Sequence, residues 1–421
     1  QAKKALPGQA PVEKKPYQAS VDYQEQYLNE WMQHYSQRSH HKNANYNRPW
    51  YMLLGDSFSG KSAIIRQSDQ VIPLDYASEY IRELHEGIEL KTLKLALTTS
   101  AVIIDPPGEF FQSGDGSVEK GASRGERLHQ HLLDWLIQHR PRQPLNGVVL
   151  TLNVQQLMAM NDETRRVWMQ GWQARILELS DRFACRIPVY IVINKIDVLN
   201  GFEALYPSLS QKLRTQTLGV SFSIVTEQGN GWRQELTNFW NEWQNSLNQL
   251  MPEQMINGTS IDLRTSLFCF LGQLSALRKV TEEIINDLLR HYNRDPGRQM
   301  LIRGCYFTSA VQQNRRSDFF QDAISRRYEL REPTQGVWPS KENQRGYFIH
   351  QLFAEVLFAE PHLAGENNEF TRVRRHNLAL ATVISGGVAL ALLSGWYYYY
   401  LRNYQAGQLA LKKVETFQKI G

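Results

Sequence analysis

The residues Gly55-Asp56-Ser57-Phe58-Ser59-Gly60-Lys61-Ser62 decide the fold, and they directly follow the apolar run Trp50–Leu54. The stretch is a complete G-x-x-x-x-G-K-[ST] sequence, which is typical of a loop that binds phosphate between a strand and a helix. Gly55 and Gly60 let backbone N–H groups turn inward around the phosphate. A helix expected from Ala63 points the positive end of its dipole at the same place, which favours a phosphate loop over a chance glycine-rich turn.

Further residues complete the predicted phosphate site. Lys61 is predicted to reach the β- and γ-phosphates, and the hydroxyl of Ser62 is predicted to bind Mg²⁺. A second apolar run, Ala101–Ile104, ends in Asp105-Pro106-Pro107-Gly108. We expect Asp105 to hold Mg²⁺ through water and the N–H of Gly108 to face the γ-phosphate. The alternative is that Asp105 only caps a helix or a turn.

A candidate base site follows the apolar run Val189–Ile193, which ends in Asn194-Lys195-Ile196-Asp197. N-K-x-D is the guanine-reading sequence of GTPases. The carboxylate of Asp197 can accept hydrogen bonds from guanine N1–H and from the exocyclic amine, and adenine offers no such pair of donors. Asn194 would brace the loop, and the Lys195 stem would cover the ring. The alternative is a strand followed by a polar turn, with Asp197 capping a helix.

Hydrolysis has less support in the sequence than binding. A Ras-like GTPase carries Gln directly after D-x-x-G to orient the attacking water, and this chain has Glu109 there. Three threonines, Thr92, Thr98 and Thr99, are equal candidates for sensing the γ-phosphate. The catalytic residues therefore stay unassigned, and we expect slow turnover of GTP or another nucleoside triphosphate, or binding without turnover.

Short apolar runs alternate with polar, helix-favouring stretches between Arg48 and Val225. Buried strands separated by helices imply a parallel sheet that is covered on both faces. The predicted strands are Trp50–Leu54, Ala101–Ile104, Gly147–Val154, Val189–Ile193 and Val220–Val225. The polar stretches between them that favour helices include Gly125–His139 and Gln155–Phe183.

The pattern changes to helical periodicity from about Gly229 to Asn293, and the run Leu301–Thr308 reads as a short strand. We therefore predict an α/β fold: a P-loop GTPase-like parallel sheet covered by helices, followed by a helical subdomain and one transmembrane helix. The predicted boundaries are 1–47 for a linker and an N-terminal helix at about 21–35, 48–228 for the GTPase-like domain, 229–371 for the helical subdomain, 372–403 for a basic flank and membrane helix, and 404–421 for the start of an extracytoplasmic region.

Composition narrows the class of protein without naming its function. The chain has 421 residues and a formal net charge of +5, which is mild, and it shows no basic stripe with interleaved aromatic residues of the kind that binds nucleic acid. The three cysteines, Cys185, Cys269 and Cys305, fit no metal spacing. We interpret them as buried thiols in a reducing compartment.

Leu378 to Leu401 contains no charged residue and is long enough for a helix that crosses about 30 Å of hydrocarbon. A buried core helix is the alternative, although globular cores rarely need so long an uncharged run. Arg372, Arg374 and Arg375 crowd the N-terminal flank, whereas only Arg402 lies close on the other side. The positive-inside rule then places residues before 378 in the cytoplasm and residues after 401 in the periplasm.

Several separated motifs resemble the IcmF/TssM family of bacterial secretion-system inner-membrane proteins. The resemblance covers about Arg48 to Leu401, and the motifs keep their order along the chain. They are Arg48–Tyr51 before the phosphate loop, Asn146–Thr151, Pro188–Ile191 leading to Asn194–Asp197, Gly201-Phe202, Arg303–Ser309, Tyr347–Phe358 and Leu363–Asn367.

The resemblance implies a structural part of a type VI or type IVB (Dot/Icm-like) secretion envelope complex in the bacterial inner membrane. It implies two further membrane helices upstream, a large periplasmic region, and a DotU/TssL-type inner-membrane partner. The phosphate loop is variable in this family. Leu95–Ser100 stands where type VI members carry a stretch rich in Trp and Phe, and Pro106–Glu109 replaces the commoner T-A-G-R. These departures favour the type IVB branch.

Three functions follow from these observations. The first is a structural secretion component whose GTPase-like domain regulates assembly, with GTP and Mg²⁺ as cofactors. The second is a membrane-tethered regulatory GTPase that acts as a switch. The third is a scaffold in which the phosphate loop serves packing alone, so that Lys61→Ala would leave its function intact.

Overall fold

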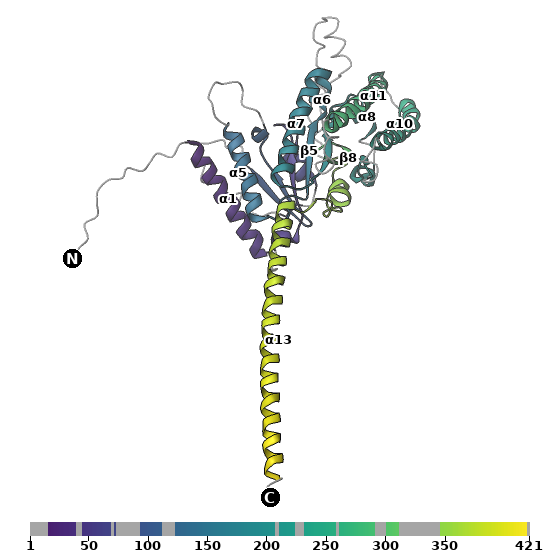
Figure 1. Cartoon of the computed structure of the whole chain (residues 1–421). Helices are drawn as coiled ribbons and strands as arrows, with labels where there is room; N and C mark the ends of the chain where they lie inside the picture. The colour runs from purple at the N-terminus through teal and green to yellow at the C-terminus, as the bar shows by residue number, and fades with distance from the viewer. Residues whose placement is uncertain are drawn as a thin grey trace, which may run out of the picture. The chain divides into compact units, whose positions relative to one another are not determined.

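The computed structural model describes residues 16–38, 44–68, 71–72, 93–111, 123–206, 210–223, 231–257, 261–290, 300–310 and 346–418. The chain forms two compact units, Gln1–Glu366 and Asn367–Gly421 (Figure 1). Most of the predicted N-terminal linker lies outside the described residues.

One eight-stranded sheet, with the strand order β2-β3-β4-β1-β5-β6-β8-β7, organises the first unit. The five strands β4, β1, β5, β6 and β8 run parallel, whereas β2, β3 and β7 at the two edges pair antiparallel. The strands are β1 (Trp50–Leu54), β2 (Val71–Ile72), β3 (Lys94–Thr98), β4 (Val102–Asp105), β5 (Gly147–Asn153), β6 (Pro188–Asn194), β7 (Gly219–Ser221) and β8 (Leu301–Thr308).

The expected parallel sheet is therefore correct for the centre and wrong for the edges. The difference at β3 comes from a tight turn, because the Thr98 hydroxyl donates to Ala101 O at 2.9 Å and accepts from Ala101 N at 2.8 Å. Only an antiparallel pair can be joined by so short a connection. The predicted strand Leu301–Thr308 exists as β8 and lies between β6 and β7.

Helices and short helical turns cover both faces of the sheet (Figure 1). The longer helices are α1 (Pro16–Arg38), α5 (Arg124–His139), α7 (Asp162–Arg182), α10 (Gly231–Asn257) and α11 (Ile261–Leu289). The shorter elements are α2 (Ala44–Asn47), α3 (Lys61–Gln67), η1 (Gly108–Phe111), α6 (Val154–Ala159), η2 (Ile196–Val198), α8 (Phe202–Leu205), α9 (Gln211–Thr215) and η6 (Leu352–Leu357).

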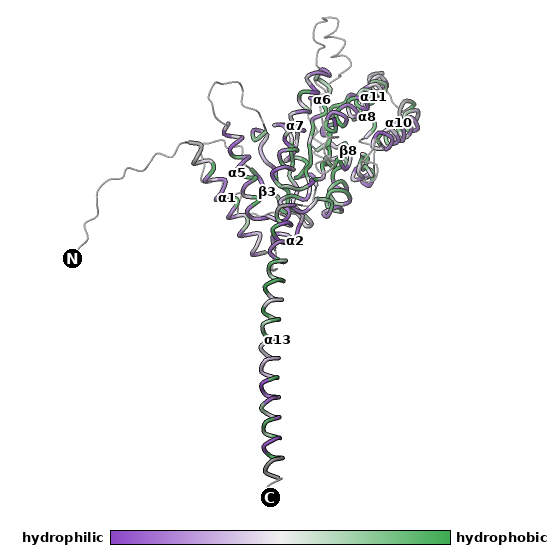
Figure 2. The backbone as a smooth tube through the Cα atoms, in the orientation of Figure 1, coloured by the Kyte–Doolittle hydropathy of each residue, from purple (hydrophilic) through white to green (hydrophobic). Residues whose placement is uncertain are grey.

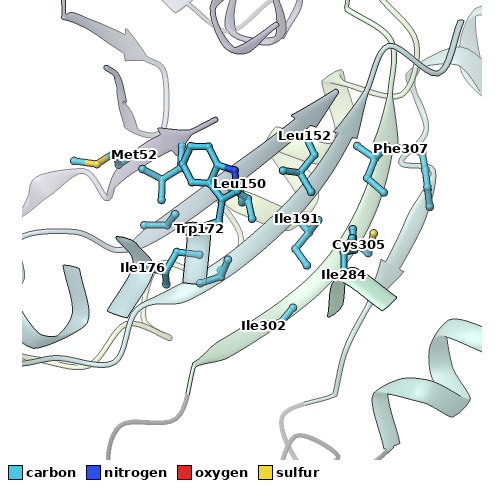
Figure 3. Packing of buried hydrophobic residues seen from close by; sticks show 14 of the residues in the cluster. Met52, Leu150, Leu152, Trp172, Ile176, Ile191, Ile284, Ile302, Cys305 and Phe307 are labelled. Atoms are coloured by element: carbon cyan, nitrogen blue, oxygen red, sulfur yellow. The ribbon is translucent and has the colours of Figure 1, made fainter. Parts of the chain in front are cut away.

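The two cores follow the alternation of side chains along each strand. Met52, Leu150 and Ile191 belong to the core on one face, together with Trp172 and Ile176 of α7 and Ile284 of α11 (Figure 3). The next residues in β1 and β6, Leu53 and Val192, point to the opposite face, which α3 and η6 cover. Because both faces are buried, the central strands read as continuous apolar runs, which is why the sequence shows them clearly.

Helix α1 packs against α5 through hydrogen bonds from side chains. Gln24 Nε2 donates to Leu128 O at 2.9 Å, and Trp135 Nε1 donates to Asn29 Oδ1 at 2.9 Å. Beside them, Trp31 meets Trp50 of β1 edge to face, with ring centroids 5.6 Å apart. The N-terminal helix is thus part of the core around β1 and α5.

The second unit is built on one long helix, α13 (Asn368–Gln418), of 51 residues. Within it, Phe370–Val414 is long and apolar enough to cross a membrane, with a hydropathy of 2.0 over its most apolar window. Figure 2 shows the apolar stretch of this helix in green. The Asn367 side chain caps its start, since Asn367 Oδ1 accepts a hydrogen bond from Phe370 N at 3.2 Å.

A substitution at Gly201 tests the packing of α11 against the segment that follows β6. The φ of Gly201 is +96°, and a Cβ there would lie 2.3 Å from Ser266 O of α11. We expect Gly201→Ala to lower the free energy of unfolding by at least about 2 kcal/mol, because the substitution adds both backbone strain and a clash. Urea unfolding of the detergent-solubilised chain, followed by tryptophan fluorescence, measures the change.

Gly272 provides the matched control. It lies in α11, and a Cβ there would meet no atom of the described residues within 4 Å. Gly272→Ala should raise stability by roughly 0.5–1 kcal/mol, because alanine is favoured over glycine inside helices. Equal effects of the two substitutions would contradict the docking described for Gly201.

Candidate functional site

The predicted site residues meet at the carboxyl edge of the parallel strands. β1 leads into Gly55, β4 ends at Asp105, and β6 ends at Asn194. Since these strands are parallel, their carboxyl ends lie at one edge of the sheet, the edge where open α/β sheets bind ligands. β8 adds Thr308 and the residues after it to the same edge.

The phosphate loop approaches its neighbours too closely for side chains at its two glycines. Gly55 has φ +152°, and a Cβ there would lie 2.4 Å from Thr151 O at the end of β5. Gly60 has φ +92°, and a Cβ there would lie 2.2 Å from Asn194 Nδ2. Phe58, at the exposed apex of the loop, also has a positive φ of 66°. The glycines are therefore required by packing as well as by backbone conformation.

Lys61 begins α3 and is buried, at 6% exposure. Its Nζ donates to Gly55 O at 2.5 Å and to Asp56 O at 3.0 Å. Burial lowers the pKa of the Lys61 ammonium, and the carboxylates of Asp105 and Asp56 oppose that shift. A buried cation held by carbonyl oxygens is well suited to meet an anion.

Asp56 lies inside the phosphate loop, where a carboxylate facing a phosphate would repel it. Its Oδ2 instead accepts hydrogen bonds from Gln156 Nε2 of α6 at 3.0 Å and from Trp168 Nε1 of α7 at 2.9 Å. The side chain thus anchors the loop to these two helices. No pattern in the sequence indicates this contact, because the two donors lie 100 and 112 residues away.

Ser62 and Asp105 form a contact between α3 and the end of β4. The Ser62 hydroxyl donates a hydrogen bond to Asp105 Oδ2. Burial raises the pKa of the Asp105 carboxyl, and the Ser62 hydrogen bond and the Lys61 charge act in the opposite direction. A hydroxyl and a carboxylate offer the hard oxygen ligands that Mg²⁺ prefers.

The residues after Asp105 include those proposed to face the γ-phosphate. Gly108 is buried at the start of η1, whereas Glu109 is exposed. Thr98 is committed to the turn with Ala101, and Thr99 is exposed. Thr92 lies outside the described residues.

Asn194 joins the base loop to the phosphate loop. Its Nδ2 donates to Ser59 O at 2.9 Å, and its Oδ1 accepts from Thr308 Oγ1 and from Ala310 N, each at 3.2 Å. Lys195 follows with φ +66°, and burial lowers the pKa of its ammonium, while the Asp197 carboxylate opposes the shift.

Asp197 lies in η2 and is 6% exposed. Its Oδ1 accepts a hydrogen bond from Ser309 Oγ at 2.5 Å. The Asp197 carboxylate and the Asn194 amide are therefore both held by the segment that follows β8. None of Thr308, Ser309 and Ala310 was predicted for this site. Thr308 and Ser309 were noted only as part of a family motif, and Ala310 was not singled out, although a Thr-Ser pair at the end of an apolar strand was the available signal.

These residues fit a nucleotide with Mg²⁺. Among the described residues, the buried hydroxyls Ser59 Oγ and Thr151 Oγ1 have no hydrogen-bond partner. Ser59 Oγ lies 2.8 Å from the position of a Cβ at Gly55, and Thr151 approaches Gly55 through its backbone carbonyl. Unpaired polar atoms beside a glycine cradle, a buried lysine and a Ser–Asp pair form a set of donors and ligands suited to phosphate and a divalent cation.

A model of the IcmF-related N-terminal domain matches residues 122–385, which is more than half of the chain. The chain belongs to the IcmF-related family. The matched region includes Asn194, Lys195 and Asp197, whereas the phosphate loop and Asp105 precede it.

One similar protein is the type VI secretion system component TssM1 of Pseudomonas aeruginosa. It is 27% identical over 377 residues, which cover 88% of this chain and 32% of that protein. The IcmF-related chain described here therefore spans about a third of the length of this relative.

Solved structures resemble the chain only distantly. A complex of SsGBP with GDP is 14% identical over 45% of this chain and 49% of its own, with a TM-score of 0.20. A GDP-bound mutant of the S. thermophilus FeoB G-domain is 14% identical over 59% of this chain and 91% of its own, with a TM-score of 0.21.

A substitution at Ser309 tests, without any ligand, whether its hydroxyl holds the Asp197 carboxylate. Ser309→Ala removes a donor from a buried carboxylate, so we expect a loss of about 1–3 kcal/mol in stability. Ser246→Ala is the control: its hydroxyl is exposed and bonds Glu242 O within α10, so the change should stay within about 0.5 kcal/mol. Thermal unfolding measures the stability of both variants. A Ser309→Ala variant as stable as the control would contradict the hydrogen bond between Ser309 and Asp197.

Proposed function

We propose that this chain is the membrane-anchored, nucleotide-binding part of an inner-membrane component of a bacterial secretion system. Family membership and the similarity to TssM1 support this role. They favour a type VI system over the type IVB system that Pro106–Glu109 suggested. A DotU/TssL-type membrane protein is the proposed partner, and a pulldown with the full chain that recovers no such protein would count against it.

The proposed topology places residues before 378 in the cytoplasm and residues after 401 in the periplasm. It is supported by the basic residues Arg372, Arg374 and Arg375 on one flank of the apolar stretch of α13. A cytoplasmic first unit would also have access to cytosolic nucleotide.

Cysteine labelling in intact cells tests this topology. Gln408→Cys in α13 should react with a membrane-impermeant maleimide, whereas Gln33→Cys in α1 should react only after lysis. Both positions are exposed, and the native Cys185 and Cys305 are buried. Cys269 is only half-buried, so both variants are made in a Cys269→Ser background to keep labelling of native thiols low. Labelling of Gln33→Cys alone in intact cells would reverse the proposed orientation.

We propose further that the site at the carboxyl edge of the sheet binds a guanine nucleotide with Mg²⁺. The observation that carries this proposal is the hydrogen bond from Asn194 Nδ2 to Ser59 O, because it sets the base loop beside the phosphate loop. One ligand can then meet Lys61 at its phosphates and Asp197 at its base. Separate placement of these loops would have allowed no shared ligand.

Each side chain has a defined part in the proposed site. Lys61 and the N–H groups of the phosphate loop bind the phosphates, and Ser62 and Asp105 hold the metal. Mg²⁺, when bound, neutralises phosphate charge. Asp197, fixed by Ser309, accepts hydrogen bonds from the guanine edge. Glu109 is exposed and no described residue is assigned to orient water, so we propose binding that regulates assembly, with slow turnover at most.

Asp197→Asn tests the base assignment by changing which ring fits. An Asn amide presents one acceptor and one donor, which match xanthine N1–H and its C2 carbonyl instead of the two guanine donors. We expect affinity for the guanine nucleotide to fall at least tenfold and affinity for the xanthine nucleotide to rise, as calorimetry would measure. Preference of the unmodified chain for ATP would exclude a guanine-reading role for Asp197.

Lys61→Ala tests the phosphate site in the same assay. Binding should fall about tenfold or more, since the phosphates lose their buried cation. Lys279→Ala is the control, because Lys279 is an exposed lysine of α11, and its affinity should be unchanged. An unaltered affinity of Lys61→Ala would support the packing-only scaffold instead.

A further inference from the structure

The short 3₁₀ helix η1 rests directly on the phosphate loop. A Cβ at Gly108 would lie 2.3 Å from Ser57 N and 2.5 Å from Ser57 Oγ. The two backbones are therefore in contact, with no room between them for a side chain. This contact lies on the side of the loop toward Asp105, where β4 leads into η1.

A third phosphate needs the space that this contact occupies. In the proposed site, the first phosphates lie against the N–H groups of the loop, and the γ-phosphate extends toward Asp105 and the N–H of Gly108. Each N–H···O hydrogen bond takes about 2.9 Å between heavy atoms. Two backbone segments that share one phosphoryl group must therefore stand apart by more than the contact between Ser57 and Gly108 allows.

η1 is also held from behind by the start of α5. A Cβ at Gly125 would lie 2.2 Å from Glu109 O, so the first turn of α5 touches the backbone of η1. Phe110 and Phe111 are 2% and 9% exposed, and the Phe111 ring meets His129 of α5 with centroids 5.3 Å apart. η1 cannot leave the phosphate loop without moving packed side chains or α5 itself.

We propose that this arrangement of η1 accepts a nucleoside diphosphate, and that a triphosphate enters only when η1 moves off the phosphate loop and displaces the first turn of α5. The inference rests on the proposed function, because it assumes that the site binds a nucleotide. The inference goes beyond that function in stating how many phosphates the site accepts and that η1 distinguishes two phosphates from three.

Direct binding measurements on the full chain in nanodiscs test the proposal. The probes are fluorescent GDP and a fluorescent, non-hydrolysable GTP analogue, each with Mg²⁺. We expect GDP to bind at least about fivefold more tightly, since moving a packed element typically couples to binding by 5–150-fold. The non-hydrolysable analogue removes turnover from the comparison.

Two substitutions separate the contact from other causes. Ser57→Gly removes the Oγ that faces Gly108, and Gly108→Ala places a methyl group against Ser57, so both should weaken the resting contact. Each variant should bring the affinity ratio of diphosphate to triphosphate closer to one. Gly171→Ala in α7, where a Cβ would meet no atom of the described residues within 4 Å, is the control and should keep the wild-type ratio.

Hydrogen exchange provides a readout independent of affinity. The triphosphate analogue should increase amide exchange in η1 and in the first turn of α5, and GDP should leave that exchange low. Equal or tighter binding of the triphosphate analogue by the wild-type chain, with unchanged exchange in η1, would overturn the inference and leave the proposed nucleotide site standing. Failure of both nucleotides to bind would overturn the site and the inference together.

Discussion

The side-chain amide of Asn194 holds the segments of the candidate site together. Its Nδ2 donates to Ser59 O in the phosphate loop, and its Oδ1 accepts hydrogen bonds from Thr308, the last residue of β8, and from Ala310. One residue at the end of β6 therefore ties together the loops that follow β1, β6 and β8. Gly60 makes this possible, because any side chain there would occupy the position of the amide nitrogen. The sequence predicts the phosphate loop and the base loop separately, but the contact between them depends on the close approach of Asn194 to Gly60.

The sequence predicts the parts of the fold whose physics is local. The central strands are buried on both faces, so they appear as uninterrupted apolar runs, and β1 matches its predicted bounds of Trp50–Leu54. The pairing of β3 was not predicted, because an antiparallel edge strand depends on the turn at Thr98 and on its neighbours. The membrane-type helix was also visible from composition alone.

The candidate site likewise has a part that the sequence predicts and a part that it does not. Sequence patterns name Lys61, Asp105 and Asp197, because spacing within a loop carries that information. The contacts that fix these residues are long-range: Ser309 lies 112 residues from Asp197, and Trp168 lies 112 residues from Asp56. No local pattern specifies such pairs. Only the folded chain reveals that a third segment, Thr308–Ala310, contacts Asn194 and Asp197.

The unbroken α13 has a consequence for the residues beyond Leu401. Starting a helix is costly and extending it is cheap, so a helix that already covers the membrane-length apolar stretch can extend into the residues that follow it. Its 51 residues run roughly 75 Å at 1.5 Å each, more than twice the hydrocarbon thickness of about 30 Å. Each residue rotates the helix by about 100°. The direction in which Tyr404 or Leu411 projects from the helix axis is therefore fixed relative to that of Gly387. Rotation of α13 about its long axis would therefore reorient every side chain along it together.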